Sequence, residues 1–109
     1  MIKTDVDIRH YKTVSAYSID NSDLTLHSGD HIHVSQYGGS AIYDSNVKVE
    51  IIKDPTGTPE VLFCTHGDSV QDVPNALVEG PITIRISLNN QSSSAETIGA
   101  YYTGELCDE

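Results

Sequence analysis

Two histidines separated by a single residue, His31 and His33, are the first candidates for chemistry in this chain. On a β-strand this spacing directs both imidazole rings to one face, where they could bind zinc, copper or iron. A complete site would also need a nearby carboxylate and a further histidine from a later strand. The next carboxylate, Asp44, follows a pair of glycines, and only His66 could be the late ligand. The pattern therefore favours histidines on a solvated face, and we predict no metal or other cofactor.

No motif for catalysis is present in the sequence. It lacks the Gly-x-Ser-x-Gly turn that presents a nucleophilic serine and the glycine-rich loop that binds phosphate before a helix. Ser69 stands near His66 and Asp68 along the chain, but a catalytic triad is defined by geometry in space. We predict that the protein is not an enzyme.

The elements that must position these residues are all predicted to be strands. Short runs rich in Val, Ile, Thr and Tyr are separated by Gly, Pro, Asn and Asp, as in β-sandwiches and barrels. Residues 82–88 alternate most regularly, a Pro/Gly turn is expected at residues 54–57, and Asp-Asn-Ser-Asp at residues 20–23 indicates another turn. We predict an all-β protein, a single antiparallel β-sandwich of the Greek-key or jelly-roll type with seven to eight strands.

A chain of 109 residues forms one domain. We expect an N-terminal arm or edge strand at residues 1–9, the β-sandwich at residues 10–104 and an acidic, frayed C-terminal tail at residues 105–109. The predicted core consists of Tyr17, Ile19, Leu24, Leu26, Ile32, Val34, Val47, Val49, Ile51, Val61, Phe63, Ile82, Ile84, Ile86, Leu88, Ile98, Ala100 and Tyr102.

The two cysteines do not form a disulfide framework, and Cys64, within an apolar run, is predicted to be a small buried hydrophobic residue. The first twelve residues alternate in charge and lack the apolar stretch of a secretion signal. No run approaches the roughly 18 apolar residues of a membrane span. We expect a reduced protein made in the cytoplasm.

The chain is strongly acidic, with 16 Asp and Glu against 6 Lys and Arg and a formal charge of −10. Such a surface repels phosphate backbones and anionic membranes, so neither nucleic acid nor a membrane is expected as a partner. Lys3, Arg9 and Lys12, half of the basic residues, lie within the first twelve positions. This cluster fits either a solvated face or an arm that docks on an acidic partner.

Residues 47–104 resemble, in style, small accessory proteins of tailed bacteriophage virions. The shared pattern is an alternating strand (47–51), a Pro/Gly turn (54–57), an Ile-Thr-Ile-Arg-Ile strand (82–86) and a closing strand that ends Tyr-Thr-Gly (102–104). The resemblance covers about half of the chain, has no invariant motif and is greatest to capsid decoration (cementing) proteins. It implies a structural protein on the outside of the capsid that bridges neighbouring capsomers, and it implies no catalytic residues.

Such a protein would bind the major capsid protein or another virion protein on the capsid surface and form homo-oligomers on the particle. An unpaired strand or arm can extend a partner's sheet, and many weak copies act by multivalency. The predicted contact residues are Ile2, Lys3, Ile8, Arg9, Tyr11 and Lys12, with the loop at Tyr37 as the second choice.

Two other functions remain open from the sequence. A phage tail or adaptor component would share this composition. A carbohydrate- or receptor-binding module would use Tyr37 or Tyr43, although the lack of tryptophan makes a sugar-binding platform less favourable.

Overall fold

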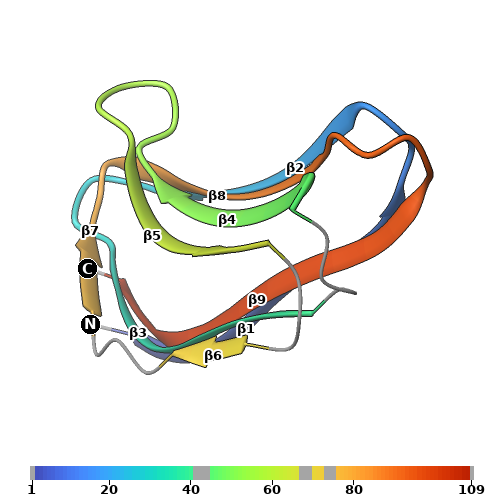
Figure 1. Ribbon diagram of the computed structural model, residues 1–109. Coiled ribbons are helices and arrows are strands. Elements are labelled where there is room, and N and C mark those ends of the chain that lie inside the picture. Colours follow the sequence, from blue (N-terminus) through green and yellow to red (C-terminus); the bar gives the residue numbers. More distant parts are fainter. Residues whose placement is uncertain (1, 41–44, 67–69, 73–75, 109) are drawn as a thin grey trace.

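The computed structural model describes residues 2–40, 45–66, 70–72 and 76–108, and within these residues it contains only strands (Figure 1). They form two antiparallel sheets that pack face to face, in the orders β1-β9-β3-β6, with β7 also on β3, and β2-β8-β4-β5. The strands are β1 (Ile2–Val14), β2 (Ser18–Leu26), β3 (His31–Ser40), β4 (Val47–Lys53), β5 (Glu60–Thr65), β6 (Val70–Asp72), β7 (Ala76–Glu79), β8 (Ile82–Asn90) and β9 (Glu96–Asp108).

The predicted antiparallel β-sandwich is confirmed. The short strands β6 and β7 pair with successive parts of β3, so together they occupy the position of one strand. Each sheet is therefore four strands wide. The chain passes from one sheet to the other at each end of the sandwich, so that β1 lies over β2 and β9 over β8 (Figure 1). This strand order is that of a double-sheet jelly roll.

The core lies between the sheets because alternate residues of each strand point inward. In β8, Ile84, Ile86 and Leu88 are fully buried, while the residues between them are half-buried on the outer side. Most of the predicted core is buried as expected: Leu26, Ile32, Val34, Val47, Val49, Ile51, Phe63, Ile84, Ile86, Leu88, Ile98, Ala100 and Tyr102. Leu24 and Ile82 are partly buried against this cluster.

Three predicted core residues, Tyr17, Ile19 and Val61, are exposed instead. The turn predicted at residues 20–23 lies within the continuous strand β2, so Ile19 cannot share a face with Leu24. Tyr17 lies in the connection before β2, and Val61 is turned outward by an irregularity in the pairing of β5 with β4.

The terminal segments both belong to the first sheet. Residues 2–9 form part of β1, an edge strand, and residues 105–108 form the end of β9 rather than a frayed tail. β1 pairs with β9 without a break, from Ile2 opposite Asp108 to Val14 opposite Glu96. The predicted tail is therefore wrong, because this ladder satisfies the backbone groups of residues 105–108.

At the end of the sandwich away from the chain termini, one buried amide joins two connections. The Asn90 side chain is fully buried, and its Nδ2 donates to the carbonyl oxygens of Val14 and Ser94, both at 2.9 Å, and of Ser15 at 3.3 Å. Its Oδ1 accepts from the backbone N of Ser92 at 3.0 Å and from the Ser92 hydroxyl at 2.7 Å. A buried polar group with this many partners fixes the β1–β2 and β8–β9 connections relative to each other.

We expect Asn90→Ala to lower the free energy of unfolding by about 2 kcal/mol or more, because buried carbonyl groups lose their donor. Urea unfolding followed by circular dichroism measures this. Asn89→Ala is the matched control, since the Asn89 Oδ1 accepts only an exposed hydrogen bond from Gln91 at 2.7 Å. That variant should change stability by less than about 0.5 kcal/mol. Equal losses in the two variants would contradict the structural role of Asn90.

Candidate functional site

Among the described residues, five large hydrophobic side chains are exposed, and three of them, Tyr11, Tyr17 and Ile19, lie within residues 11–19. Tyr17 is 67% exposed and Ile19 is 57% exposed, the two highest values of the five. Tyr17 lies in the connection after β1 and Ile19 is the second residue of β2, at the end of the sandwich that Asn90 stabilises. We call Tyr17 and Ile19, together with the connection of residues 15–17, the tip.

The backbone holds Tyr17 in a conformation that bulky residues rarely adopt. Its φ is 57°, in the left-handed region that is sterically unfavourable for an aromatic residue. The flanking contacts enforce this turn: Asn90 binds the Ser15 carbonyl, and the Ser18 hydroxyl donates to the Ala16 carbonyl at 3.2 Å. The turn therefore holds the Tyr17 side chain outward at a cost in backbone strain.

Charged side chains beside the tip form a compact cluster. The Asp20 carboxylate lies 2.8 Å from Lys12 Nζ and 2.7 Å from His10 Nε2, which joins β1 to β2. The hydrogen bonds from Lys12 and then from His10 lower the pKa of Asp20 below its usual value. Further along β2, the guanidinium of Arg85 binds both oxygens of Asp23, at 2.8 and 3.0 Å, and lowers the pKa of that carboxyl.

The predicted contact residues of β1 do not share one face. Lys3, Arg9 and Tyr11 are exposed on the outer face, whereas Ile8 is partly buried against the core and Lys12 pairs with Asp20 of the other sheet. Ile2 lies opposite Asp108 in the ladder. Because side chains alternate along a strand, an arm of consecutive residues cannot present all of these groups to one partner.

Tyr37 is buried, with 1% exposure, so the prediction that it forms an accessible binding loop is wrong. Ile32 and Val34 point inward, and the pairing of β3 with β9 shifts by one residue between Val34 and Gln36. This irregularity turns the odd-numbered Tyr37 toward the core, where its ring centroid lies 6.0 Å from that of Phe63. Tyr43 lies outside the described residues.

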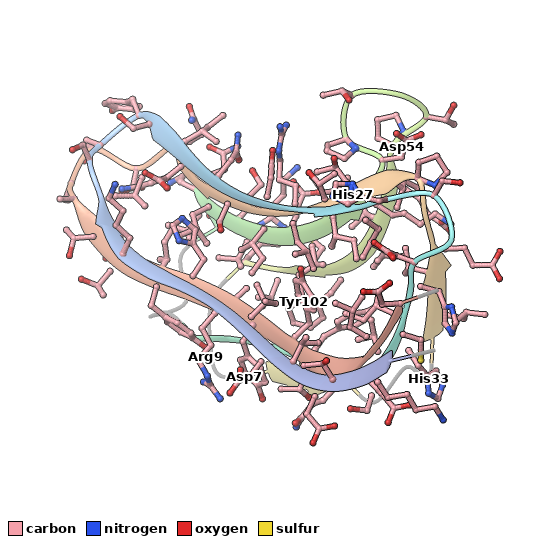
Figure 2. All side chains as sticks on the ribbon, turned by 180° about the vertical axis from the view of Figure 1, so that it is seen from behind. Asp7, Arg9, His27, His33, Asp54 and Tyr102 are labelled. Carbon is pink, nitrogen blue, oxygen red and sulfur yellow. The ribbon has the colours of Figure 1, made fainter. Side chains whose placement is uncertain are left out.

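The outer face of the first sheet carries an ordered group around Tyr101. The Arg9 guanidinium lies 4.8 Å from the Tyr101 ring centroid, and its Nε lies 2.9 Å from Asp7 Oδ1. The Tyr11 ring packs over Gly99, where a Cβ atom would leave no room for it. Figure 2 shows Asp7 and Arg9 on the outside of the sheet, away from the second layer.

His31 and His33 lie on β3, half-buried and exposed respectively. His31, with Asp30 and Glu79, lines a surface pocket of about 210 Å³ between two turns. His66, the proposed late ligand, is bonded through Nδ1 to the Val47 carbonyl oxygen at 3.0 Å. Among the described residues, no three His, Cys, Asp or Glu side chains are grouped so that they could hold a metal ion.

The prediction for Cys64 is also wrong, because its side chain is exposed on β5 while Cys107 is the buried cysteine. Partial burial and the neighbouring Glu50 carboxylate raise the pKa of the Cys64 thiol. A thiol that stays protonated is a poor nucleophile. Burial also raises the pKa of the Tyr102 hydroxyl, which lies between the sheets (Figure 2) and has no hydrogen-bond partner among the described residues.

The sequence reasoning missed Asn90 and the exposure of the tip. For Asn90 a signal was present, because the inward alternation of Ile84, Ile86 and Leu88 continues to this residue. For Tyr17 no signal was present, since nothing in the local sequence specifies its positive φ.

Comparison with known proteins places the fold but not a family. No protein-family model matches the chain, and no curated protein matches it. The fold is similar to that of a protein of Bacillus endospore appendages, which form a family of disulfide-linked pili. The TM-score is 0.56 at 12% identity, over 98% of this chain and 89% of that chain. The core of Drosophila NLP, described with pentamer formation and histone binding, gives 0.47 at 14% identity, over 92% and 98% of the two chains.

The first likeness supports the sandwich fold alone, and the second carries no argument. No helix in the described part of the chain is long and apolar enough to cross a membrane.

The acid stability of the protein should depend on Asp23. Its pKa is lowered by folding, so its contribution is present above the ordinary value of 3.8 and is lost as the pH falls through the lower folded value. We expect the wild type to lose more stability between pH 6 and pH 2.5 than Asp23→Asn does, measured by urea unfolding. Asp5→Asn is the control, because Asp5 forms no ion pair with any described residue. If Asp23→Asn loses as much stability over this pH range as the wild type does, the result would contradict this assignment.

Proposed function

We propose that this chain is a non-enzymatic structural protein that docks by its tip on the outside of a larger protein assembly, and that this assembly is a bacteriophage capsid. The observation that carries the proposal is the pair of exposed apolar side chains on a braced, strained turn: Tyr17 at 67% and Ile19 at 57% exposure. An exposed tyrosine has few rotatable bonds and both an apolar body and a hydroxyl, which suits it to an interface centre.

The stiffness of the tip favours binding. Asn90 already fixes the connections that carry Tyr17, so little backbone freedom remains to be lost when a partner docks. The tip also lies at the opposite end of the sandwich from the two chain ends (Figure 1), so no described part of the termini covers it.

The charge of the molecule points to a partner surface that supplies positive groups. All six basic side chains are paired with carboxylates of the same chain, namely Lys3, Arg9, Lys12, Lys48, Lys53 and Arg85. The chain has 16 acidic residues, so a formal charge of −10 remains after these six basic groups are counted. The complementary surface is therefore basic around an apolar centre.

Two considerations support a capsid in particular. The sequence from residue 47 to residue 104 resembles phage accessory proteins, and jelly rolls are among the folds used in viral capsids. The fold alone is not an argument for function, because lectins and other proteins share it. A tail or adaptor component would dock in the same way at a different place on the virion.

A second candidate is a subunit of a protein fibre. The similar Bacillus protein belongs to disulfide-linked pili, and this chain matches it over 98% of its length. A linear polymer linked by disulfides needs at least two accessible thiols per subunit, whereas Cys64 is exposed and Cys107 is 4% exposed. We therefore rank this candidate below the first.

The test of docking is the Tyr17→Asn variant. Asparagine tolerates a positive φ, so this change removes the aromatic ring without adding backbone strain. We expect binding to expanded, undecorated phage capsids, measured by co-sedimentation, to weaken at least about tenfold. Val61→Thr is the control and should bind as the wild type does. Val61 is also exposed, at 51%, but it lies on β5, in the same sheet as β2 and outside the tip.

Equal binding by wild type and Tyr17→Asn would remove the tip from the contact. Absence of capsid binding by the folded wild type would reject the capsid, and the tail and fibre candidates would be tested next by binding to isolated tails and by electron microscopy.

A further inference from the structure

We propose that two copies of this chain pair through the free edge of β1, antiparallel and in full register about a twofold axis at Ile8. The two sheets, each four strands wide, would then join into one continuous sheet across the dimer. This inference does not depend on the proposed function, because β1 and the tip are different parts of the surface.

The edge of β1 is the longest sheet edge among the described strands. It is 13 residues long, contains neither glycine nor proline, and its ladder with β9 has no irregularity. At about 3.4 Å per residue it spans roughly 40 Å, most of the 47 Å long axis of the molecule. A long and regular edge strand presents an unpaired row of backbone donors and acceptors that favours addition of another strand.

The other described edges are less suited to pairing. β2 carries Asp-Asn-Ser-Asp at residues 20–23, which are residues depleted in strands. β5 is six residues long and its pairing with β4 is irregular, and β6 and β7 have three and four residues. Short or irregular edges resist sheet extension.

Full overlap of β1 with its copy fixes one register. The strand runs from residue 2 to residue 14, so residue 2 of one copy lies opposite residue 14 of the other. The numbers of any two opposed residues therefore add up to 2 + 14 = 16. Ile8 is then opposite Ile8 of the second copy, and Asp7 is opposite Arg9 of the second copy, twice. Directly opposite side chains share a face, so both of these ion pairs form on the outer face. The twofold axis passes between the two Ile8 residues. In an antiparallel ladder such an axis can pass through either a hydrogen-bonded or a non-hydrogen-bonded residue pair.

The side chains that would meet are already placed for this contact. The Asp7 and Arg9 side chains are 53% and 55% exposed on the outer face, 2.9 Å apart at their charged atoms. Tyr101, below the Arg9 guanidinium at 4.8 Å, restricts its orientation. In the dimer the four charges alternate in sign around the axis, whereas shifting the register by two residues puts Asp7 opposite Asp7 in one direction and Arg9 opposite Arg9 in the other.

The net charge of the chain also singles out β1. The strand contains Lys3, Arg9 and Lys12 against Asp5 and Asp7, a charge of 3 − 2 = +1, while the remainder of the chain carries −10 − 1 = −11. Lys3 and Lys12 are paired with Glu105 and Asp20 of neighbouring strands, so the attraction between two copies comes from Asp7 and Arg9.

The experiment uses two charge reversals, Asp7→Arg and Arg9→Asp, each made in the full chain. Either one places four like charges around the axis and should raise the dimer dissociation constant at least about tenfold. An equimolar mixture of the two variants restores opposite charges in every pair and should dimerise as the wild type does. Size-exclusion chromatography with light scattering, over a concentration series, distinguishes 11.8 kDa from twice that mass.

The mixture is also the control for folding, because a variant that cannot fold cannot form the mixed dimer. The double variant Asp7→Arg with Arg9→Asp should dimerise by itself. A wild type that is monomeric throughout the concentration series would overturn the proposal. So would a dimer that tolerates both single reversals, since it would use another surface. Neither result bears on capsid binding, which is measured separately with Tyr17→Asn.

Discussion

The side chain of Asn90 is the constraint on which the arrangement of this sandwich depends. The β1–β2 and β8–β9 connections each pass from one sheet to the other, and the single amide binds the carbonyl groups of Val14 and Ser15 on one side and of Ser94 on the other. These hydrogen bonds hold β1 over β2 and β9 over β8 at this end of the sandwich. The cluster of His10, Lys12 and Asp20 also joins β1 to β2.

Much of the fold could be predicted from the sequence, because side-chain alternation is a local signal. In β4 and β8, every second residue points inward, so the buried residues of these strands could be predicted from the alternation of apolar and polar residues. Most of the core could be predicted in the same way. The errors come from interruptions of that period. The irregularity after Val34 turns Tyr37 inward, and the one after Ile51 turns Val61 outward. At residues 20–23 a sequence typical of turns lies within a strand, because the bidentate ion pair between Asp23 and Arg85 and the ladder with β8 outweigh local preference.

The candidate site was less predictable than the fold, for two physical reasons. Exposure of Tyr17 depends on a backbone conformation imposed by contacts with distant residues, among them Asn90. The basic residues near the N-terminus are paired with carboxylates on three different strands, so a cluster along the sequence does not produce a positive surface. A cluster of charge predicts a binding surface only when its counter-ions are not already supplied by the same fold.

The unbroken ladder between β1 and β9 also determines how the molecule would respond to mechanical force. The two chain ends lie side by side, because Ile2 is opposite Asp108. Pulling these ends apart would load the hydrogen bonds one after another and unzip the strands at low force. A pull along the strands, applied between the tip and the C-terminal end of β9, would instead load all the hydrogen bonds of the 13-residue ladder at once, in shear. If the molecule were held at the tip and at the C-terminal end of β9, a load between these two points would therefore act along its mechanically strong direction.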